Sequence, residues 1–278
     1  MALMMRNRRP SGSSRAGAGE PILLVHPFML SHHSWRPVME RLSRGHDVMA
    51  VSMPGHYGGP ELGWRRSTFA HMVDHIEQEM DRAGWATAHI VGNSLGGWAT
   101  LELACRGRAR TATAIAPAGG WERLAPRDIA MGLTFVAAAL ASPAFRFTTH
   151  LPHQLVPIRR VALKAVAHNP ALIHPRDAHH VIRTALGATH PLQVVAACAR
   201  SIPWELAEID VPVHLVFAER DLVIPPKRYA RFFTDRLPEA RVTMLEGIGH
   251  CPQVEAPQLV ADLVRDTIAA SAPRAAAG

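Results

Sequence analysis

The chain has 278 residues, of which 48% are hydrophobic and 19% are charged. This length and composition allow one large α/β domain or two small ones with a substantial core, and they exclude general disorder. The net charge of +7 suggests a nucleic-acid partner. However, basic residues gather in the first twenty residues and at Arg106, Arg108 and Arg110, where a helix is expected to end. Basic and aromatic residues do not interleave, so we expect no nucleic-acid partner.

The cysteines and histidines show no pattern of a metal or disulfide site. The three cysteines are widely spaced and fit neither a disulfide framework nor a C-x-x-C motif: Cys105, Cys198 and Cys251. Two pairs of histidines are adjacent in sequence, His32 with His33 and His179 with His180. On a helix, adjacent side chains point apart, so neither pair is placed to hold one metal ion. We therefore expect no metal and no cofactor.

The sequence carries no sign of a membrane segment. No apolar run approaches the ~18 residues that span a bilayer. The first twenty residues have arginines but no apolar stretch of a secretory signal. We expect a cytoplasmic monomer or homodimer that acts on a small molecule and has no membrane partner.

The first half of the chain alternates between strand and helix patterns. Residues 1–20 are rich in Arg, Ser and Gly without periodicity, so we expect a disordered basic tail. The expected strands then cover residues 22–25, 47–52, 88–92 and 111–116. Helical patterns begin near Ser34, after Thr68 as N-cap, and at residue 95. This alternation predicts an α/β fold with a mostly parallel, doubly wound sheet flanked by helices.

The alternation stops between residues 121 and 204, where only helical patterns occur. The expected helices there cover residues 126–141, 156–168, 176–187 and 190–200, and prolines separate them. We expect a helical cap inserted at the carboxyl edge of the sheet. Strands are expected again at 213–217 and 240–245, with helices at 226–236 and 254–269. The predicted core therefore spans 21–120 and 205–270, and 271–278 is expected to fray.

One turn in the first half has the spacing of a nucleophile elbow. Gly92-Asn93-Ser94-Leu95-Gly96 reads G-x-S-x-G between an expected strand and an expected helix. A serine in such a sharp turn exposes its hydroxyl, and glycines two residues before and after leave room for the turn. The backbone N–H of Leu95 would point at a developing oxyanion. The spacing therefore predicts Ser94 as a nucleophile.

A serine nucleophile needs a base and an acid that orients the base. Asp221 follows the expected strand 213–217, and His250 follows the expected strand 240–245. Parallel strands deliver their carboxyl ends to one edge, so Ser94, Asp221 and His250 are expected to converge. Glu219 and Asp210 are alternative acids.

From Pro21 to about Ile268 the chain resembles the cap-bearing α/β-hydrolases of the esterase, C–C hydrolase and haloperoxidase-like group. The matching motifs are L-L-V-H-P-F at 23–28, M-P-G-H-Y-G-G at 53–59, G-N-S-L-G-G at 92–97, A-E-R-D at 218–221, I-P-P at 224–226 and G-I-G-H-C-P at 247–252. The resemblance implies an α/β-hydrolase fold, short at the N-terminus, with a Ser94–His250–Asp221 triad. Relatives with an aspartate nucleophile, the dehalogenases and epoxide hydrolases, are disfavoured because position 94 is serine.

The first loop departs from the family pattern. The family usually has H-G-x there, whereas this chain has His26-Pro27-Phe28. Pro27 has no N–H and a fixed φ, so the resemblance implies an oxyanion hole made by Phe28 and Leu95. Trp98, Phe135 and Ile224 are the expected substrate contacts.

These motifs together predict a serine hydrolase that cleaves an ester-like bond of a small, mainly apolar substrate through an acyl-serine. A C–C bond hydrolase or a lyase with the same triad remains an alternative. A non-catalytic binding protein on this fold is another, although it would not need all three members of a triad. A scaffold that uses the basic tail is a fourth, and deletion of residues 1–20 would test it.

Overall fold

The structure is a computed structural model, and it describes residues 12–64, 67–121, 125–145, 163–202 and 204–271. Within these ranges the strands form one sheet in the order β1-β3-β2-β4-β5-β6-β7. β1 is antiparallel to β3, and the other neighbouring strands are parallel. The strands are β1 Ser13–Ala16, β2 Glu20–Val25, β3 His46–Val51, β4 Ala88–Asn93, β5 Ala109–Ile115, β6 Val213–Ala218 and β7 Arg241–Leu245. The expected mostly parallel sheet is confirmed.

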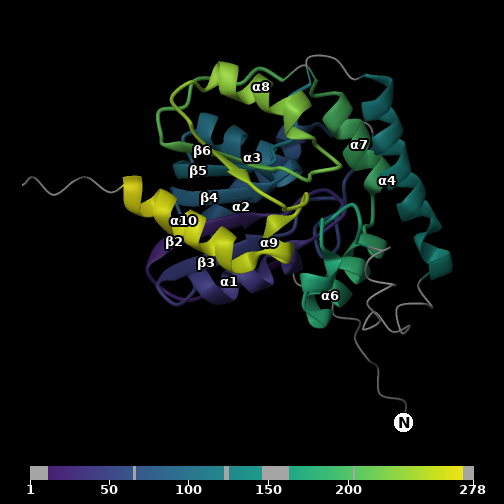
Figure 1. Ribbon diagram of the computed structural model, residues 1–278, viewed down its shortest axis with the longest axis horizontal. Coiled ribbons are helices and arrows are strands. Elements are labelled where there is room, and N and C mark those ends of the chain that lie inside the picture. The colour runs from purple at the N-terminus through teal and green to yellow at the C-terminus, as the bar shows by residue number, and fades with distance from the viewer. Residues whose placement is uncertain (1–11, 65–66, 122–124, 146–162, 203, 272–278) are drawn as a thin grey trace, which may run out of the picture.

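Helices cover both faces of this sheet (Figure 1). Successive residues of β2 show why, because Leu23 joins one hydrophobic cluster and Leu24 joins the other. Helices α2 Phe69–Arg82, α3 Leu95–Cys105 and α8 Pro226–Arg236 contribute to the first cluster. Helices α1 Arg36–Leu42 and α10 Pro257–Ser271 contribute to the second. The chain is therefore doubly wound, with fully buried strands in the middle of the sheet.

A helical region connects β5 to β6, and its described residues contain no strand. It consists of α4 Pro126–Phe145, η3 Pro170–Leu172, α6 Pro175–Leu186 and α7 Pro191–Ala199. His190 donates its N–H to Gly55 O at 3.0 Å, so α7 begins against the loop that follows β3. Of the helix expected at 156–168, residues 156–162 lie outside the described residues, and residues 163–166 form a turn.

Both ends of the described chain differ from expectation. Disorder was expected over residues 1–20, but Ser13–Ala16 forms β1 on the edge of the sheet. Arg15 explains part of this order, since its Nε donates to Asp47 Oδ1 at 2.8 Å and its guanidinium lies 5.0 Å from the Trp85 ring. Near the C-terminus, the helix expected at 254–269 is divided into α9 Pro252–Glu255 and α10, because Pro257 starts a new helix.

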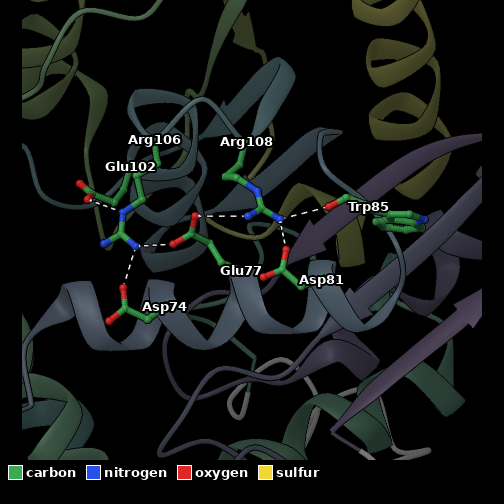
Figure 2. Close-up of polar contacts among 7 residues, drawn as sticks. All are labelled: Asp74, Glu77, Asp81, Trp85, Glu102, Arg106 and Arg108. Atoms are coloured by element: carbon green, nitrogen blue, oxygen red, sulfur yellow. Dashed lines mark hydrogen bonds and ion pairs between the residues drawn. The ribbon is translucent and has the colours of Figure 1, made fainter.

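The arginines that follow α3 are paired with carboxylates (Figure 2). Arg106 Nη1 lies 2.7 Å and 2.6 Å from two carboxylates of α2, and its Nε donates within α3 at 3.0 Å. Arg108 Nη2 contacts a third carboxylate of α2 and the Trp85 carbonyl. The acidic partners are Asp74, Glu77, Asp81 and Glu102. Arg106 and Arg108 therefore join α2 to the end of α3 instead of forming a free cationic patch, whereas Arg110 pairs with Glu20.

Candidate active site

Ser94 occupies a strained turn between β4 and α3. Its backbone has φ 58° and ψ −115°, a conformation that a residue with a side chain rarely adopts. Two hydrogen bonds hold the turn against the end of β5: Ser94 N–H to Ile115 O at 2.8 Å, and Ala118 N–H to Ser94 O at 2.9 Å. The sheet therefore stabilises the conformation that lifts this serine out of the strand.

The two glycines of the G-x-S-x-G motif lie where no side chain fits. A Cβ at Gly92 would lie 2.0 Å from Gly96 O, and a Cβ at Gly96 would lie 2.1 Å from Val25 O. These contacts place the start of α3 directly against the end of β2. The elbow spacing of the sequence thus has a steric cause, because the turn closes over backbone atoms on both sides.

Asp221 lies just beyond β6 and is almost fully buried. Its Oδ1 accepts hydrogen bonds from the N–H groups of Val223 and Ile224, both at 2.8 Å. Burial alone would raise the pKa of Asp221, but the interaction with His250 and these two N–H groups outweigh it, so the pKa lies below its usual value. The carboxylate is therefore held ionised.

His250 lies beyond β7, and its Nδ1 is 2.7 Å from Asp221 Oδ2. An ionised carboxylate only accepts, so Nδ1 carries the proton and Nε2 is left as the basic nitrogen of the neutral ring. His250 and Ser94 are each 6% exposed. The structure thus brings together the acid and the histidine that the strand order predicted, 29 residues apart in sequence.

The loop that carries His250 is tied to the serine turn through Asn93. Asn93 Nδ2 donates to His250 O at 2.9 Å, and Gln253 Nε2 donates to Asn93 Oδ1 at 3.0 Å. The hydrogen bonds of the described residues include none from Ser94 Oγ to the histidine; such bonds are often long without substrate. Asn93 and Gln253 were not predicted, because they act between segments that are distant in sequence.

Two backbone N–H groups are candidates for an oxyanion hole. Leu95 is the first residue of α3, so its N–H has no acceptor within the helix. Phe28 lies in a turn closed by Leu30 N–H and Pro27 O at 3.2 Å. The close contact between Gly96 and the end of β2 brings these two regions together.

His26 braces the same loop. Its Nε2 accepts from Met53 N–H at 2.9 Å, and its Nδ1 lies 2.7 Å from Pro27 O, an arrangement that fits a neutral ring with the proton on Nδ1. Burial, with a further contribution from His56, lowers the pKa of His26 well below its usual value. The ring is therefore neutral and structural at physiological pH.

The expected substrate contacts lie in different surroundings. Trp98 is fully buried and stacks on Phe69 at 3.9 Å between ring centroids, so the expectation that it contacts substrate is corrected to a core role. Its spacing one turn after Ser94 could not distinguish the core face of α3 from the exposed one. Ile224 is buried beside Asp221. Phe135 belongs to α4, but its side chain lies outside the described residues.

Across the described residues, no cluster of three metal-ligating side chains is present, and no helix is long and apolar enough to cross a membrane. The rings of His33 and His180 stack, with their centroids 5.2 Å apart. The three cysteines are free thiols.

The chain is similar to known proteins of one family. The sequence pattern of the Alpha/beta hydrolase family matches residues 22–263. The chain belongs to this family. This α/β-hydrolase is 38% identical over 207 residues to Epoxide hydrolase EphH of Mycobacterium tuberculosis. The matched residues cover 73% of the chain and 96% of that protein. It is therefore a hydrolase, as the motifs predicted.

Other relatives of this α/β-hydrolase have different names. It is 29% identical over 274 residues to pimeloyl-[acyl-carrier protein] methyl ester esterase of Neisseria meningitidis serogroup B, covering 95% of the chain and 98% of that protein. A thermophilic esterase from Thermogutta terrifontis has the same fold, with a TM-score of 0.69, 18% identity and coverage of 94% and 93%. The relatives share hydrolysis but differ in the bond that their names specify.

Proposed function

We propose that the chain is a serine hydrolase that cleaves an ester bond of a small, mainly apolar substrate. The observation that carries the proposal is the buried hydrogen bond between Asp221 and His250, which leaves the basic nitrogen of a neutral imidazole for a serine. The hydrogen bond from Asn93 to His250 O supports it, because it links the histidine loop to the residue before Ser94. Residues 121–204, rich in Ala, Leu and Val, are proposed as the cap that admits apolar groups.

The proposed reaction has two halves. Ser94 Oγ attacks the ester carbonyl while His250 Nε2 takes its proton, and the N–H groups of Leu95 and Phe28 stabilise the oxyanion. The tetrahedral species collapses to an acyl-serine, and His250 returns the proton to the leaving alkoxide. A water molecule then gives a proton to His250 and attacks the acyl-serine. As the second tetrahedral species collapses, His250 gives this proton to Ser94 Oγ, which releases the acid and restores the neutral histidine. Asp221 stays ionised throughout and stabilises the imidazolium.

A panel of chromogenic esters of graded acyl length tests the proposal on the wild type and on Ser94→Ala. We expect wild-type turnover and a fall in kcat of about 10⁴-fold or more in Ser94→Ala. An organophosphonate should label Ser94 and no other residue, as read by peptide mass spectrometry. Ester turnover that survives in Ser94→Ala, or an adduct elsewhere, would remove Ser94 as nucleophile.

Asp221→Asn tests the acid separately. The amide cannot hold Nδ1–H in the same way, so the wrong tautomer becomes favoured and kcat should fall by about 10³- to 10⁴-fold with little change in KM. An activity within tenfold of the wild type would contradict the role of Asp221 and turn attention to Glu219.

Epoxide opening is a second candidate, because the 38% identical relative is named an epoxide hydrolase. In this chain the nucleophile at the elbow cannot be a carboxylate, because position 94 is serine. A styrene-type epoxide in the same panel decides between the two functions. Epoxide turnover without ester turnover would favour this second candidate, whereas the reverse result supports the ester hydrolase.

A further inference from the structure

A buried carboxylate lies on the helical turn that follows the histidine loop. Glu255 ends α9, five residues after His250, and is only 5% exposed. In Figure 1, α9 lies at the end of α10 nearest to the helices that connect β5 to β6. The proposed reaction does not use this carboxylate. A buried charge is unfavourable unless it is well solvated by donors, so its partners indicate what it holds in place.

Three backbone N–H groups surround Glu255. Its Oε2 accepts from Gly249 N–H at 2.8 Å and from His168 N–H at 3.0 Å, and its Oε1 accepts from Asn169 N–H at 2.6 Å. The ion pairs of the described residues include none with this carboxylate. Among the described residues, the hydrogen bonds that Glu255 accepts therefore all come from main-chain N–H groups. Hydrogen bonds to a carboxylate are stronger than those to a neutral acceptor.

The three donors come from two different parts of the chain. Gly249 directly precedes His250, whereas His168 and Asn169 belong to the region between β5 and β6. One carboxylate thus connects the turn that carries the imidazole to a segment more than eighty residues away.

The same two segments also touch at Cys251, the residue that follows His250 in the chain. Cys251 N–H donates to Val166 O at 2.8 Å. A Cβ at Gly249 would lie 2.3 Å from His168 N, so only glycine lets the two backbones approach this closely. Both chain neighbours of His250 are therefore fixed to residues 166–169, and Glu255 supplies the polar bonds on one side.

We propose that Glu255 is a positioning residue for His250, which it aligns with Asp221 by tying the histidine loop to residues 166–169. The region between β5 and β6 then does more than cover the serine, because its residues 166–169 help to orient the base. The kinetic part of this inference rests on the proposed function, but the geometry of the Asp221–His250 pair does not.

Glu255→Gln tests the role. The amide keeps the shape of the side chain, but its NH₂ group cannot accept a hydrogen bond, so at least one of the three N–H groups loses its partner. We expect kcat to fall about 10- to 100-fold with KM nearly unchanged, because the base is displaced while the binding surface remains. Glu246→Gln is the matched control, since Glu246 is exposed in the same loop.

Two readouts separate positioning from a general loss of folding. In the wild type, the Nδ1 proton shared with Asp221 should give a downfield NMR resonance that Asp221→Asn abolishes. In folded Glu255→Gln this resonance should weaken or move upfield. A looser pair stabilises the imidazolium less, so the acid limb of the kcat/KM profile should move to lower pH by about 0.5 unit or more. Misfolding alone lowers the amplitude of that profile and leaves its midpoint in place.

Gly249→Ala provides a second route if Glu255→Gln does not fold. Its Cβ would push the loop away from His168 and should change the same resonance in the same direction. An unchanged resonance and an unchanged pH midpoint in folded Glu255→Gln would overturn the inference, even with a lower Tm. A wild type that hydrolyses no ester would defeat the proposed function, whereas the resonance would still decide the role of Glu255.

Discussion

At the scale of single residues, the proposed site depends on glycines, which have no side chain, as much as on the residues proposed for catalysis. Ser94 keeps a positive φ because Gly92 and Gly96 let the turn close over neighbouring backbone. Asp221 stays ionised despite burial because two N–H groups and His250 surround it. The backbone therefore fixes the geometry of the proposed site.

Gly96→Ala tests this dependence on the backbone. The added Cβ would lie 2.1 Å from Val25 O and 2.8 Å from His26 O, so the start of α3 must move away from β2. We expect a loss of about 1–3 kcal/mol in the free energy of unfolding, and a fall in kcat as the Leu95 N–H shifts. Gly45→Ala is the control, because a Cβ there meets no atom within 4 Å. Equal urea midpoints for the two variants would contradict the steric argument.

The residues that sequence analysis identified and those it missed differ in a physical way. Asp221 and His250 follow the neighbouring strands β6 and β7, so strand order was enough to predict that these two side chains meet. That Ser94 joins them as nucleophile stays a prediction. Asn93 and Glu255 act through backbone atoms of distant segments, and no spacing in the sequence reveals such partners.

At the scale of elements, α2 is joined to the end of α3 by ion pairs of Arg106 and Arg108. The three carboxylates of α2 approach Arg106 and Arg108 at one end of the serine-bearing helix. Glu102 extends the pairing, since it also accepts from Trp204 Nε1 at 2.9 Å. These bonds fix α3 at the end opposite to Ser94.

Arg106→Met should weaken this connection. The substitution leaves three carboxylates close together without their shared cation, so we expect a loss of about 1–2 kcal/mol in the free energy of unfolding at low salt. The loss should shrink in about 1 M salt because the partly exposed charges are then screened. Arg231→Met is the control, since the ion pair that the described residues give Arg231 is with exposed Asp235. A salt-independent loss would indicate packing instead of charge as the cause.

At the scale of the whole molecule, periodicity and strand order were sufficient for the core of the fold. All six strands expected after residue 20 are present, and their parallel order follows from the helices between them. β1 was missed because Ser13–Ala16 is short and polar, and its order comes from pairing with β3 and from the contacts of Arg15. The boundaries of the cap at residues 121 and 204 stay a prediction. The hydrophobic pattern of its helices does not mark where the inserted region begins or ends.

Buried histidines make the stability of the whole molecule depend on pH. Burial lowers the pKa of His56 and of His214 to about 4, and burial with nearby His33 and His180 lowers that of His32 to about 3. An unfolded chain with histidine pKa values near 6.5 binds more protons below that pH, so stability is present above pH ~6.5 and is lost as the pH falls toward ~4.

We therefore expect Tm to decrease steadily from pH ~6.5 to ~4. His214→Gln should reduce the slope of that decrease, because His214 is buried between Thr243 and Thr267 and lies outside the proposed site. Differential scanning calorimetry across this range provides the measurement. A Tm independent of pH between ~6.5 and ~4 would show that these rings protonate without unfolding.

The antiparallel strand β1 also determines how the N-terminus can be shortened. β3 pairs with β2 on one side, and β1 covers its other side from Val48 to Val51. Removing residues 1–11 leaves that cover in place, whereas removing residues 1–20 strips it and presents a row of unpaired N–H and C=O groups to other molecules. We expect the longer deletion to form aggregates in light scattering and the shorter one to stay monodisperse. A deletion that tests the basic tail must therefore end before Gly12. A longer deletion would measure the effect of an exposed sheet edge instead of the effect of the removed basic residues.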